Sequence, residues 1–445
     1  MTLPSPGQEV APAAAPERSQ NGRVHGEPWP TRAPLALRPL VGLPMFAALG
    51  FREYRLVWGA QFGNSMGIAM DQVARGWLMY DLTGSTVELG LVAGVRMLPG
   101  LLLSPIAGVM ADRSNRKVQL IVAQVLNAIL NFVLAALILD HRVATWHVYV
   151  TGLAVAIVQV FEIPARQSMI AETVDRARLT NAIGLNSVAW NVSMSLGPAA
   201  AGALIATVGP GWSYVVQGVI YAFSTVWTIQ LRVGARVEGA RSPTGSILAG
   251  MIDGWRYIAR HPVIRGGMTM VMLVALFGLS FATLLPAVAR DELRVGASGQ
   301  GLLATALGLG ALASAFVVAG QGDRFPKGPV MLIGGALLAV AETAFGLSAD
   351  FGLSMVLMVV IGACSVTCTV LINTVLQRHA EPEIRGRVMS MYQQSQVALT
   401  LGGILAGALA AAIGSPHTIA LMGLACLAGV AVVGVGMPSV RGIRQ

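Results

Sequence analysis

The chain has 445 residues, of which 55% are hydrophobic and only 11% are charged, and its mean hydropathy is +0.67. Soluble globular domains carry roughly 25% charged residues, so a soluble protein of this length would have too little charge to cover its surface. These figures exclude a soluble protein and indicate an integral membrane protein whose apolar excess faces the lipid bilayer. The net charge of +9 would indicate nucleic-acid binding in a soluble chain, but here the basic residues follow the membrane topology, so no nucleic-acid partner is expected.

The first 50 residues differ in composition from the rest of the chain. Nine of the 22 prolines fall within residues 1–45, mixed with Ala, Gly, Ser and Arg. Such a segment cannot bury a core, which predicts a disordered, Pro-rich cytoplasmic tail at 1–50. It lacks the layout of a cleavable signal, so the first span is expected to direct membrane insertion.

After the tail, the sequence predicts an all-α membrane protein with twelve transmembrane helices in two six-helix bundles, at residues 51–233 and 263–437. The first six predicted spans lie at residues 54–80, 85–110, 118–139, 146–170, 180–206 and 212–233. The second six lie at residues 264–289, 298–320, 329–348, 353–377, 387–413 and 417–437. A cytoplasmic linker at 234–262 is expected to contain an amphipathic helix on the membrane surface, and 438–445 form a second cytoplasmic tail.

The basic residues predict the orientation. Only three of the 30 Lys and Arg residues fall in predicted external loops and three lie well inside a span, so 24 fall on the cytoplasmic side when the N-terminus is inside. The external three are Arg142, Arg290 and Arg294. This bias predicts that both termini are cytoplasmic.

The two halves repeat a charged pair at the end of a span. Asp112 and Arg113 end the second span, and Asp323 and Arg324 end the eighth, 211 residues later. Two parallel six-helix halves joined by a long basic loop are typical of a secondary transporter whose binding site lies between the halves.

The first of these loops carries five defining residues, namely Gly108, Asp112, Arg113, Arg116 and Lys117. They closely resemble the signature between the second and third helices of the major facilitator superfamily. A degenerate copy, with Ala319 in place of the glycine, consists of Asp323, Arg324 and Lys327. The resemblance implies that the cluster latches the two halves together on the cytoplasmic side.

A second set of small residues occupies the fifth span, namely Gly184, Gly197, Pro198 and Gly202. These residues resemble part of the glycine- and proline-rich motif of the antiporters in this superfamily, with Ser193 and Ala201 in place of two of its glycines. The alternative interpretation is ordinary close packing of small residues between membrane helices.

Further blocks, such as Gly76-Trp77-Leu78 and Pro164-Ala165, resemble the branch of the superfamily that contains the enterobactin exporter and macrolide efflux pumps. The resemblance covers almost everything after residue 50. It implies an exporter and leaves the substrate open, because the branch exports chemically different compounds.

Three charged residues lie inside the first two spans. By helical rise, Asp71 lies about 14 Å and Arg96 about 16 Å from the outer end of their helices, so the two can pair. Arg75 shares a helix face with Asp71 and Asn64. Buried charge in a membrane is a candidate functional site. Asp71 is therefore interpreted either as a carboxylate that titrates in exchange for substrate or as a permanent structural partner of Arg96.

The fourth span carries a second charged pair one helical turn apart. Glu162 is the other candidate for proton coupling, and Arg166 is its nearest charged partner in sequence. Both are expected near the cytoplasmic end, where they would exchange ion pairs with the loop cluster at residues 112–117 as the halves rock.

Polar and aromatic side chains in five spans are candidates for the substrate cavity, where stacking and a few hydrogen bonds would hold a bulky amphipathic molecule. They are Asn64, Gln159, Asn186, Trp190, Phe277, Phe281, Tyr392 and Gln396. The chain has no phosphate-binding loop, no zinc motif and no ligand spacing around its three cysteines, so neither enzymatic activity, metal nor cofactor is expected.

Together these features predict a transporter in the cytoplasmic membrane of a bacterium. We expect a monomer that exports a small organic molecule, either a drug-like compound or a siderophore, in exchange for protons by alternating access. The alternatives are uptake or facilitated diffusion and, from another class, a membrane sensor or assembly factor that does not transport.

Overall fold

The computed structural model describes residues 44–175, 178–232, 247–321 and 326–443. Within these ranges the chain is helical and has no β-strand. Ten helices of the described ranges are long and apolar enough to cross a membrane. Two more helices of membrane-spanning length, α2 (Arg52–Thr83) and α7 (Pro210–Ile229), bury several polar residues. The prediction of an all-α membrane protein with twelve helices in two bundles is confirmed.

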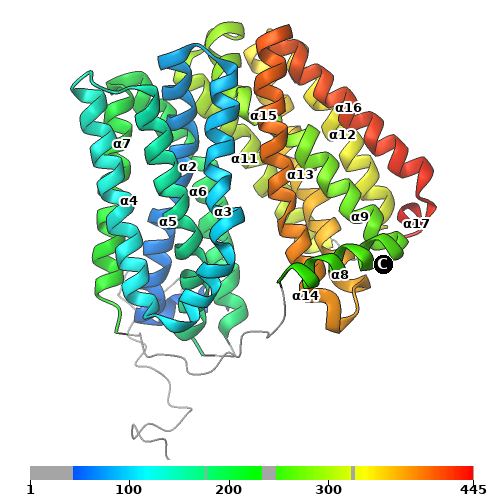
Figure 1. Ribbon diagram of the computed structural model, residues 1–445, viewed down its shortest axis with the longest axis horizontal. Coiled ribbons are helices and arrows are strands. Elements are labelled where there is room, and N and C mark those ends of the chain that lie inside the picture. The colour runs from blue at the N-terminus through cyan, green and yellow to red at the C-terminus, as the bar shows by residue number, and fades with distance from the viewer. Residues whose placement is uncertain (1–43, 176–177, 233–246, 322–325, 444–445) are drawn as a thin grey trace, which may run out of the picture.

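The first bundle is built around α2. The other members are α3 (Thr86–Arg113), α4 (Arg116–Leu139), α5 (Thr145–Glu172), α6 (Leu179–Val208) and α7. α2 contacts α3, α5, α6 and α7, whereas α4 packs mainly on α5 and α7 (Figure 1). The central place of α2 puts its polar residues inside the bundle and away from lipid.

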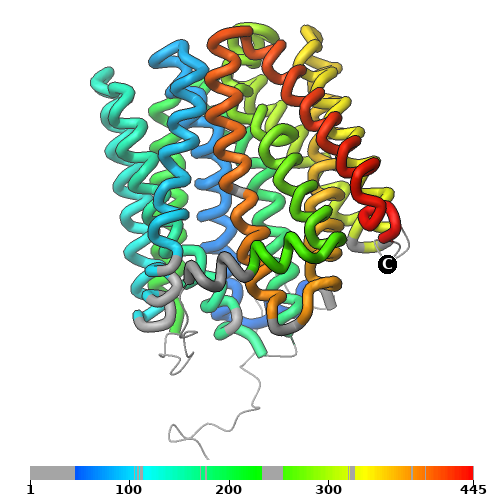
Figure 2. The backbone as a smooth tube through the Cα atoms, turned by 45° about the vertical axis from the view of Figure 1, so that its right-hand side comes forward, coloured from blue at the N-terminus to red at the C-terminus, as the bar shows by residue number. Residues whose placement is uncertain are grey.

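The second bundle has a larger apolar core. Its regular helices are α11 (Gly296–Gln321), α12 (Lys327–Leu347), α13 (Phe351–His379) and α16 (Ser415–Gly436). One span is divided into α14 (Pro382–Gln393) and α15 (Ser395–Ile413). α15 lies beside α3 of the first bundle, as both views show (Figures 1 and 2), so these helices join the halves.

The first span of the second bundle is an irregular helix. α9 (Pro262–Leu273) continues as the π-helix η4 (Val274–Leu279), the 3₁₀-helix η5 (Ser280–Leu284), the short α10 (Leu285–Ala287) and the π-helix η6 (Val288–Glu292). Pro286 lies within this stretch and has no backbone N–H to donate, which favours departure from the α-helical hydrogen-bond ladder. Such π segments occur often at functional sites.

The chain is ordered beyond the boundaries that the sequence predicted for its two tails. η2 (Pro44–Gly50) buries Ala48, whose N–H donates to Asn181 Oδ1 at 2.9 Å. α17 (Pro438–Arg441) and the residues after it pack on α9 and α12, and Gly328 N–H donates to the carbonyl of Ile443 at 3.0 Å. Apolar side chains at both termini thus cover the bundles. Residues 1–43 lie outside the described ranges.

A helix follows the part of the linker that lies outside the described residues. α8 (Ile247–Arg260) contacts α9 and α14. Ile258 is buried, whereas Trp255 is 40% exposed. The helix therefore has one face on the second bundle and one face free.

The two bundles meet at the end that carries the turn at residues 84–85, which we name the closed end (Figure 1). There Arg290 Nη1 lies 3.0 Å from Asp81 Oδ1, and Thr86 Oγ1 donates to the carbonyl of Gly407 at 3.0 Å. The opposite end, named the open end, carries η2, α8 and the C-terminus (Figures 1 and 2). Two small-residue surfaces also meet at the closed end: a Cβ added to Gly202 of α6 would lie 2.5 Å from the carbonyl oxygen of Ala297 in α11.

Replacing Gly197 with Leu is expected to destabilise the first bundle by about 1–3 kcal/mol, because overpacking displaces the neighbouring helix. A Cβ at Gly197 would lie 2.5 Å from Ala69 Cβ and 3.3 Å from the carbonyl oxygen of Met66 in α2. Gly184 is the control in the same helix, since a Cβ there meets nothing within 4 Å. Thermal unfolding of the purified variants measures the difference, and equal unfolding temperatures would contradict the packing.

Candidate functional site

The interior of the first bundle carries a row of polar side chains along one face of α2. Asn64, Asp71 and Arg75 are each no more than 4% exposed and follow one another at spacings of seven and four residues. This spacing keeps them on one helix face. Because α2 is central, that face reaches α3 and α5.

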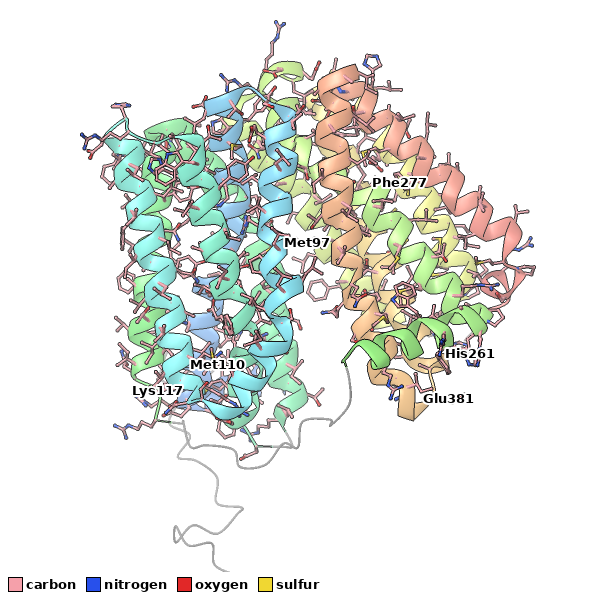
Figure 3. The ribbon with its side chains drawn as sticks, in the orientation of Figure 1. Met97, Met110, Lys117, His261, Phe277 and Glu381 are labelled. Atoms are coloured by element: carbon pink, nitrogen blue, oxygen red, sulfur yellow. The ribbon has the colours of Figure 1, made fainter. Side chains whose placement is uncertain are left out.

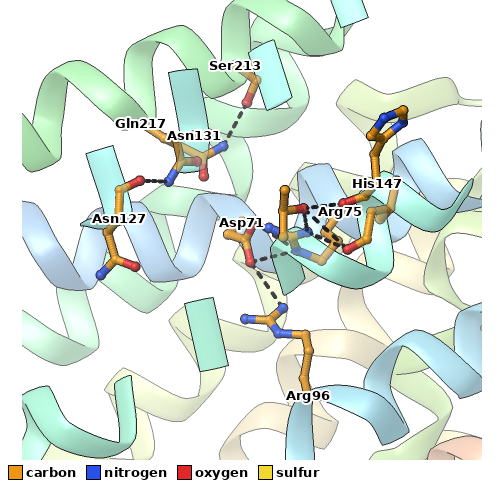
Figure 4. Close-up of polar contacts among 10 residues, drawn as sticks. Asp71, Arg75, Arg96, Asn127, Asn131, His147, Ser213 and Gln217 are labelled. Atoms are coloured by element: carbon orange, nitrogen blue, oxygen red, sulfur yellow. Dashed lines mark hydrogen bonds and ion pairs between the residues drawn. The ribbon is translucent and has the colours of Figure 1, made fainter. Parts of the chain in front are cut away.

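Asp71 is held by two arginines from two helices (Figure 4). Arg75, one turn further along α2, places Nη2 2.8 Å from Asp71 Oδ1. Arg96 of α3 places Nη1 3.1 Å from Asp71 Oδ2, so the pair expected from their depth is present. One carboxylate between two guanidinium groups leaves this cluster, named the Asp71 network, with a net positive charge.

The two arginines of the Asp71 network differ in how they are held. Arg75 Nη1 also donates to the carbonyl of Val148 at 3.0 Å and to Thr151 Oγ1 at 2.9 Å, both in α5. Arg96 has Asp71 as its recorded partner among the described residues, and its side chain is 20% exposed. Arg75 is therefore a fixed partner of Asp71, whereas Arg96 depends on the charge of Asp71.

The second charged pair is enclosed within the first bundle. Glu162 and Arg166 of α5 form an ion pair, and both are buried. With its amide turned so that nitrogen faces Glu162, Asn64 donates to Glu162 Oε1 at 3.0 Å and accepts from Arg166 Nη2 at 3.1 Å. Asn127 of α4 lies 3.5 Å from Glu162 Oε2. These four residues form the Glu162 network.

The basic residues of the loop cluster connect the ends of α4, α5 and α7 at the open end of the first bundle. Arg116 at the start of α4 forms an ion pair with Glu172 at the end of α5. Lys117 Nζ donates to the carbonyl of Leu231, just after α7, at 2.5 Å. Figure 3 shows Lys117 at this edge. In this conformation Arg116 thus pairs with Glu172, and Glu162 pairs with Arg166 in the interior of the bundle.

The remaining members of the cluster are only partly described. The side chains of Gly108, Asp112 and Arg113, together with the whole of Asp323 and Arg324, lie outside the described residues. Lys327 begins α12 and is 2% exposed. The ion pairs of Asp112, Asp323 and Arg324 therefore stay predictions.

The small residues of the fifth span face three different surroundings. Gly197 packs on α2 inside the first bundle, and Gly202 and Pro198 contact α11 of the second bundle. A Cβ added to Gly301 of α11 would lie 2.5 Å from the carbonyl oxygen of Pro198. Gly184 faces open space. Only Pro198 and Gly202 of this set therefore take part in contact between the halves.

The candidates for the substrate cavity divide into enclosed and accessible side chains. Asn64 belongs to the Glu162 network, and Phe281 is fully buried with its ring 5.6 Å from that of Phe345, so Phe281 belongs to the apolar core in this conformation. Tyr392 is also buried, at 8% exposed. The side chain of Gln396 lies outside the described residues.

Four candidates keep accessible surface. Trp190 is 42% exposed, and Gln159, Asn186 and Phe277 are half-buried. Gln159 Nε2 and Asn186 Oδ1 have no hydrogen-bond partner within the described structure. Such unsatisfied groups suit polar contacts with a ligand or with water.

Sequence reasoning missed Glu172, Thr151 and Gly152. A Cβ on Gly152 would lie 3.3 Å from Arg75 Nη1 and 3.6 Å from Arg96 Cγ, so this glycine makes room for both guanidinium groups. A glycine inside an apolar span, level with buried arginines, was the available signal. Glu172 carried no such signal, since its contact depends on how the α4 and α5 ends meet.

Comparison with protein families gives a match over residues 44–441 to the family described as transmembrane secretion effector. The multidrug efflux pump Tap of Mycolicibacterium fortuitum is 29% identical over 392 residues, which cover 85% of this chain and 93% of that protein. The enterobactin exporter EntS of Shigella flexneri is 25% identical over 389 residues, which cover 86% of this chain and 90% of that protein.

Among solved structures, a bacterial homologue of the human lysosomal transporter Spinster, in an inward-facing and unoccupied conformation, superposes with a TM-score of 0.67. The alignment covers 87% of this chain and 95% of that protein at 16% identity. At this identity the likeness establishes the shared fold.

Proposed function

The chain belongs to the transmembrane secretion effector family of the major facilitator superfamily, and we propose that it exports a bulky organic molecule in exchange for protons. As a member of this family with efflux-pump relatives, it is a multi-span transporter that exports small molecules. The relatives named as a multidrug pump and an enterobactin exporter support a drug-like compound or a siderophore as the substrate class.

The proposed orientation makes the open end cytoplasmic. With both termini inside, 24 of the 30 Lys and Arg residues fall on the cytoplasmic side, which agrees with the excess of basic residues in the cytoplasmic loops of membrane proteins. Lys117 and His261 lie at this edge of the two bundles (Figure 3). We propose that this conformation is inward-open, because the contact of Asp81 with Arg290 closes the external end.

The observation that carries proton coupling is Asp71, a buried carboxylate between two guanidinium groups. In the inward-open conformation the ion pairs hold Asp71 as a carboxylate, which corresponds to the state after release of the proton to the cytoplasm. Protonation of Asp71 from the external side would cancel both ion pairs. Arg75 would keep its bonds to α5, whereas Arg96 would lose its recorded partner.

Movement of Arg96 would transmit the protonation of Asp71 to the contact between the two bundles. Arg96 belongs to α3, and α3 packs on α15 of the second bundle. A Cβ on Gly90 of α3 would lie 2.9 Å from the carbonyl oxygen of Gly403, so these backbones touch. A change in the position of α3 therefore acts directly on the contact between the bundles. Each proton that moves inward releases roughly 2.3 kcal/mol of free energy per 100 mV of membrane potential, which is available to drive this movement.

The proposal is tested in everted membrane vesicles, whose acidic lumen corresponds to the external side. A panel of fluorescent drug-like compounds and siderophores is expected to include compounds that accumulate in the lumen in proportion to the pH gradient. A protonophore is expected to abolish the accumulation. Equilibration that ignores the gradient would indicate facilitated diffusion, and accumulation by right-side-out vesicles would indicate uptake; either result would contradict the proposal.

A further inference from the structure

A tyrosine of α7 occupies the space between the Asp71 and Glu162 networks. Tyr221 is 1% exposed, and its ring lies against Gly67 of α2. A Cβ on Gly67 would lie 2.8 Å from two ring carbons of Tyr221 and 2.9 Å from its hydroxyl oxygen. Because Gly67 has no side chain, the phenol ring of Tyr221 can pack directly on the backbone of α2.

Gly67 lies between the two networks along the helix. It follows Asn64 by three residues and precedes Asp71 by four, which corresponds to about 4.5 Å and 6 Å of helical rise. Asn64 contacts Glu162, whereas Asp71 is the carboxylate of the other network. The Tyr221 hydroxyl is thus level with the gap between two carboxylate clusters that do not touch.

The electrostatic surroundings of Tyr221 include members of both networks. It interacts with Asp71 and Arg75 of α2, with Arg96 of α3 and with Arg166 of α5. α4, which packs along α7, buries amides on its inner face instead of charges. The phenol is therefore positioned between the two networks and belongs to neither through a direct hydrogen bond.

The interior of the first bundle has unused hydrogen-bonding capacity. No hydrogen bond of the Tyr221 hydroxyl is recorded among the described residues. Both polar atoms of the Gln124 side chain, Asn127 Oδ1 and Gln217 Oε1 are buried without a partner. Buried polar atoms in proteins are usually satisfied, by ordered water where no side chain serves. These groups therefore line positions that suit buried water.

We propose that Tyr221, through bridging water, relays protons between Asp71 and Glu162, so that the two networks titrate as one unit. The relay needs no net change in the tyrosine: its oxygen accepts a proton from water on one side while its hydroxyl proton passes to water on the other. Asp71 then receives the proton near the closed end, and Glu162 passes it toward the open end. This inference depends on the proton exchange proposed above.

Tyr221→Phe tests the relay, because it removes the hydroxyl and keeps the ring against Gly67. The initial rate of gradient-driven export is expected to fall about tenfold, a modest share of what a positioned proton-transfer group can contribute. Substrate exchange across vesicles without a pH gradient is expected to stay within about twofold, since it requires no proton transfer. The dependence of the export rate on luminal pH is expected to become less steep.

Tyr54→Phe is the control. Tyr54 is fully buried, and its hydroxyl donates to the carbonyl of Ala182 at 2.8 Å, away from both networks. It precedes Asn64 by ten residues, which corresponds to about 15 Å of helical rise. Gradient-driven export by this variant is expected to match that of the unmodified protein.

The outcomes separate the relay from the proposed function. If the unmodified protein is driven by the gradient and Tyr221→Phe matches Tyr54→Phe, the relay is wrong and the proposed function stands. Loss of gradient-free substrate exchange in Tyr221→Phe would show a structural role and overturn the relay. Tyr221→His, which can still donate and accept, is expected to recover part of the rate. If the unmodified protein ignores the gradient, the proposed function fails and the relay fails with it.

Discussion

Asp71→Asn is expected to abolish gradient-driven export while substrate exchange without a gradient persists. The change removes the titrating group and both ion pairs of the Asp71 network. It also leaves two guanidinium groups in the membrane without a counter-charge, and breaking a buried pair costs about 3–5 kcal/mol. The loss of stability is expected below that range, since Arg75 keeps its bonds to Val148 and Thr151 and Arg96 is partly exposed.

A double variant separates coupling from charge balance. Asp71→Asn with Arg96→Gln removes one positive charge together with the negative one and is expected to recover much of the lost thermal stability. It is expected not to recover gradient-driven export, because position 71 no longer carries a carboxylate. Recovery of gradient-driven export would reduce Asp71 to a structural partner and transfer the coupling role to Glu162.

Gly301→Val is expected to lower export by more than about tenfold, because it prevents close packing of the halves at the closed end. A Cβ at Gly301 would lie 2.5 Å from the carbonyl oxygen of Pro198 and 3.1 Å from the Cα of Gly202, and these backbone atoms cannot rotate away. The inward-open conformation needs this contact, so the variant is expected to favour the opposite conformation. Gly320→Val is the control in the same helix, since a Cβ there meets nothing within 4 Å.

Spin labels measure the effect of Gly301→Val on conformation. Leu82 and Glu292 are exposed residues near the closed end on opposite halves, and labels there report the separation of the bundles. The distance between labels is expected to lengthen in Gly301→Val and to stay unchanged in Gly320→Val. An unchanged distance together with full export would contradict the role given to the contact between α6 and α11.

The sequence predicted those features that depend on composition and on constant helical rise. Apolar stretches of membrane-spanning length predicted the two bundles, and the pairing of Asp71 with Arg96 followed from depth alone. These predictions work because helix length is fixed per residue and neighbouring spans share the same bilayer. The i to i+4 spacing also makes contact between Asp71 and Arg75 possible within one helix.

The features that the sequence did not predict depend on helix rotation and irregular backbone. Glu162 meets Asn64 only because α2 and α5 turn particular faces toward each other, which spacing within one helix does not determine. Phe277 and Phe281 lie in the π and 3₁₀ segments η4 and η5, where a period of 3.6 residues no longer assigns faces. For that reason Phe281 lies in the core although the sequence placed it with Phe277 in the cavity set.

The central claim is that outward movement of substrate and inward movement of protons are one process that passes through Asp71. The most direct test is the luminal pH of everted vesicles, followed with a fluorescent pH indicator when substrate is added to acidified vesicles. The unmodified protein is expected to discharge the pH gradient on addition of substrate, whereas Asp71→Asn at equal membrane abundance is expected to leave the gradient intact. Discharge of equal size by Asp71→Asn, or its absence in an unmodified protein that accumulates the substrate, would contradict this account.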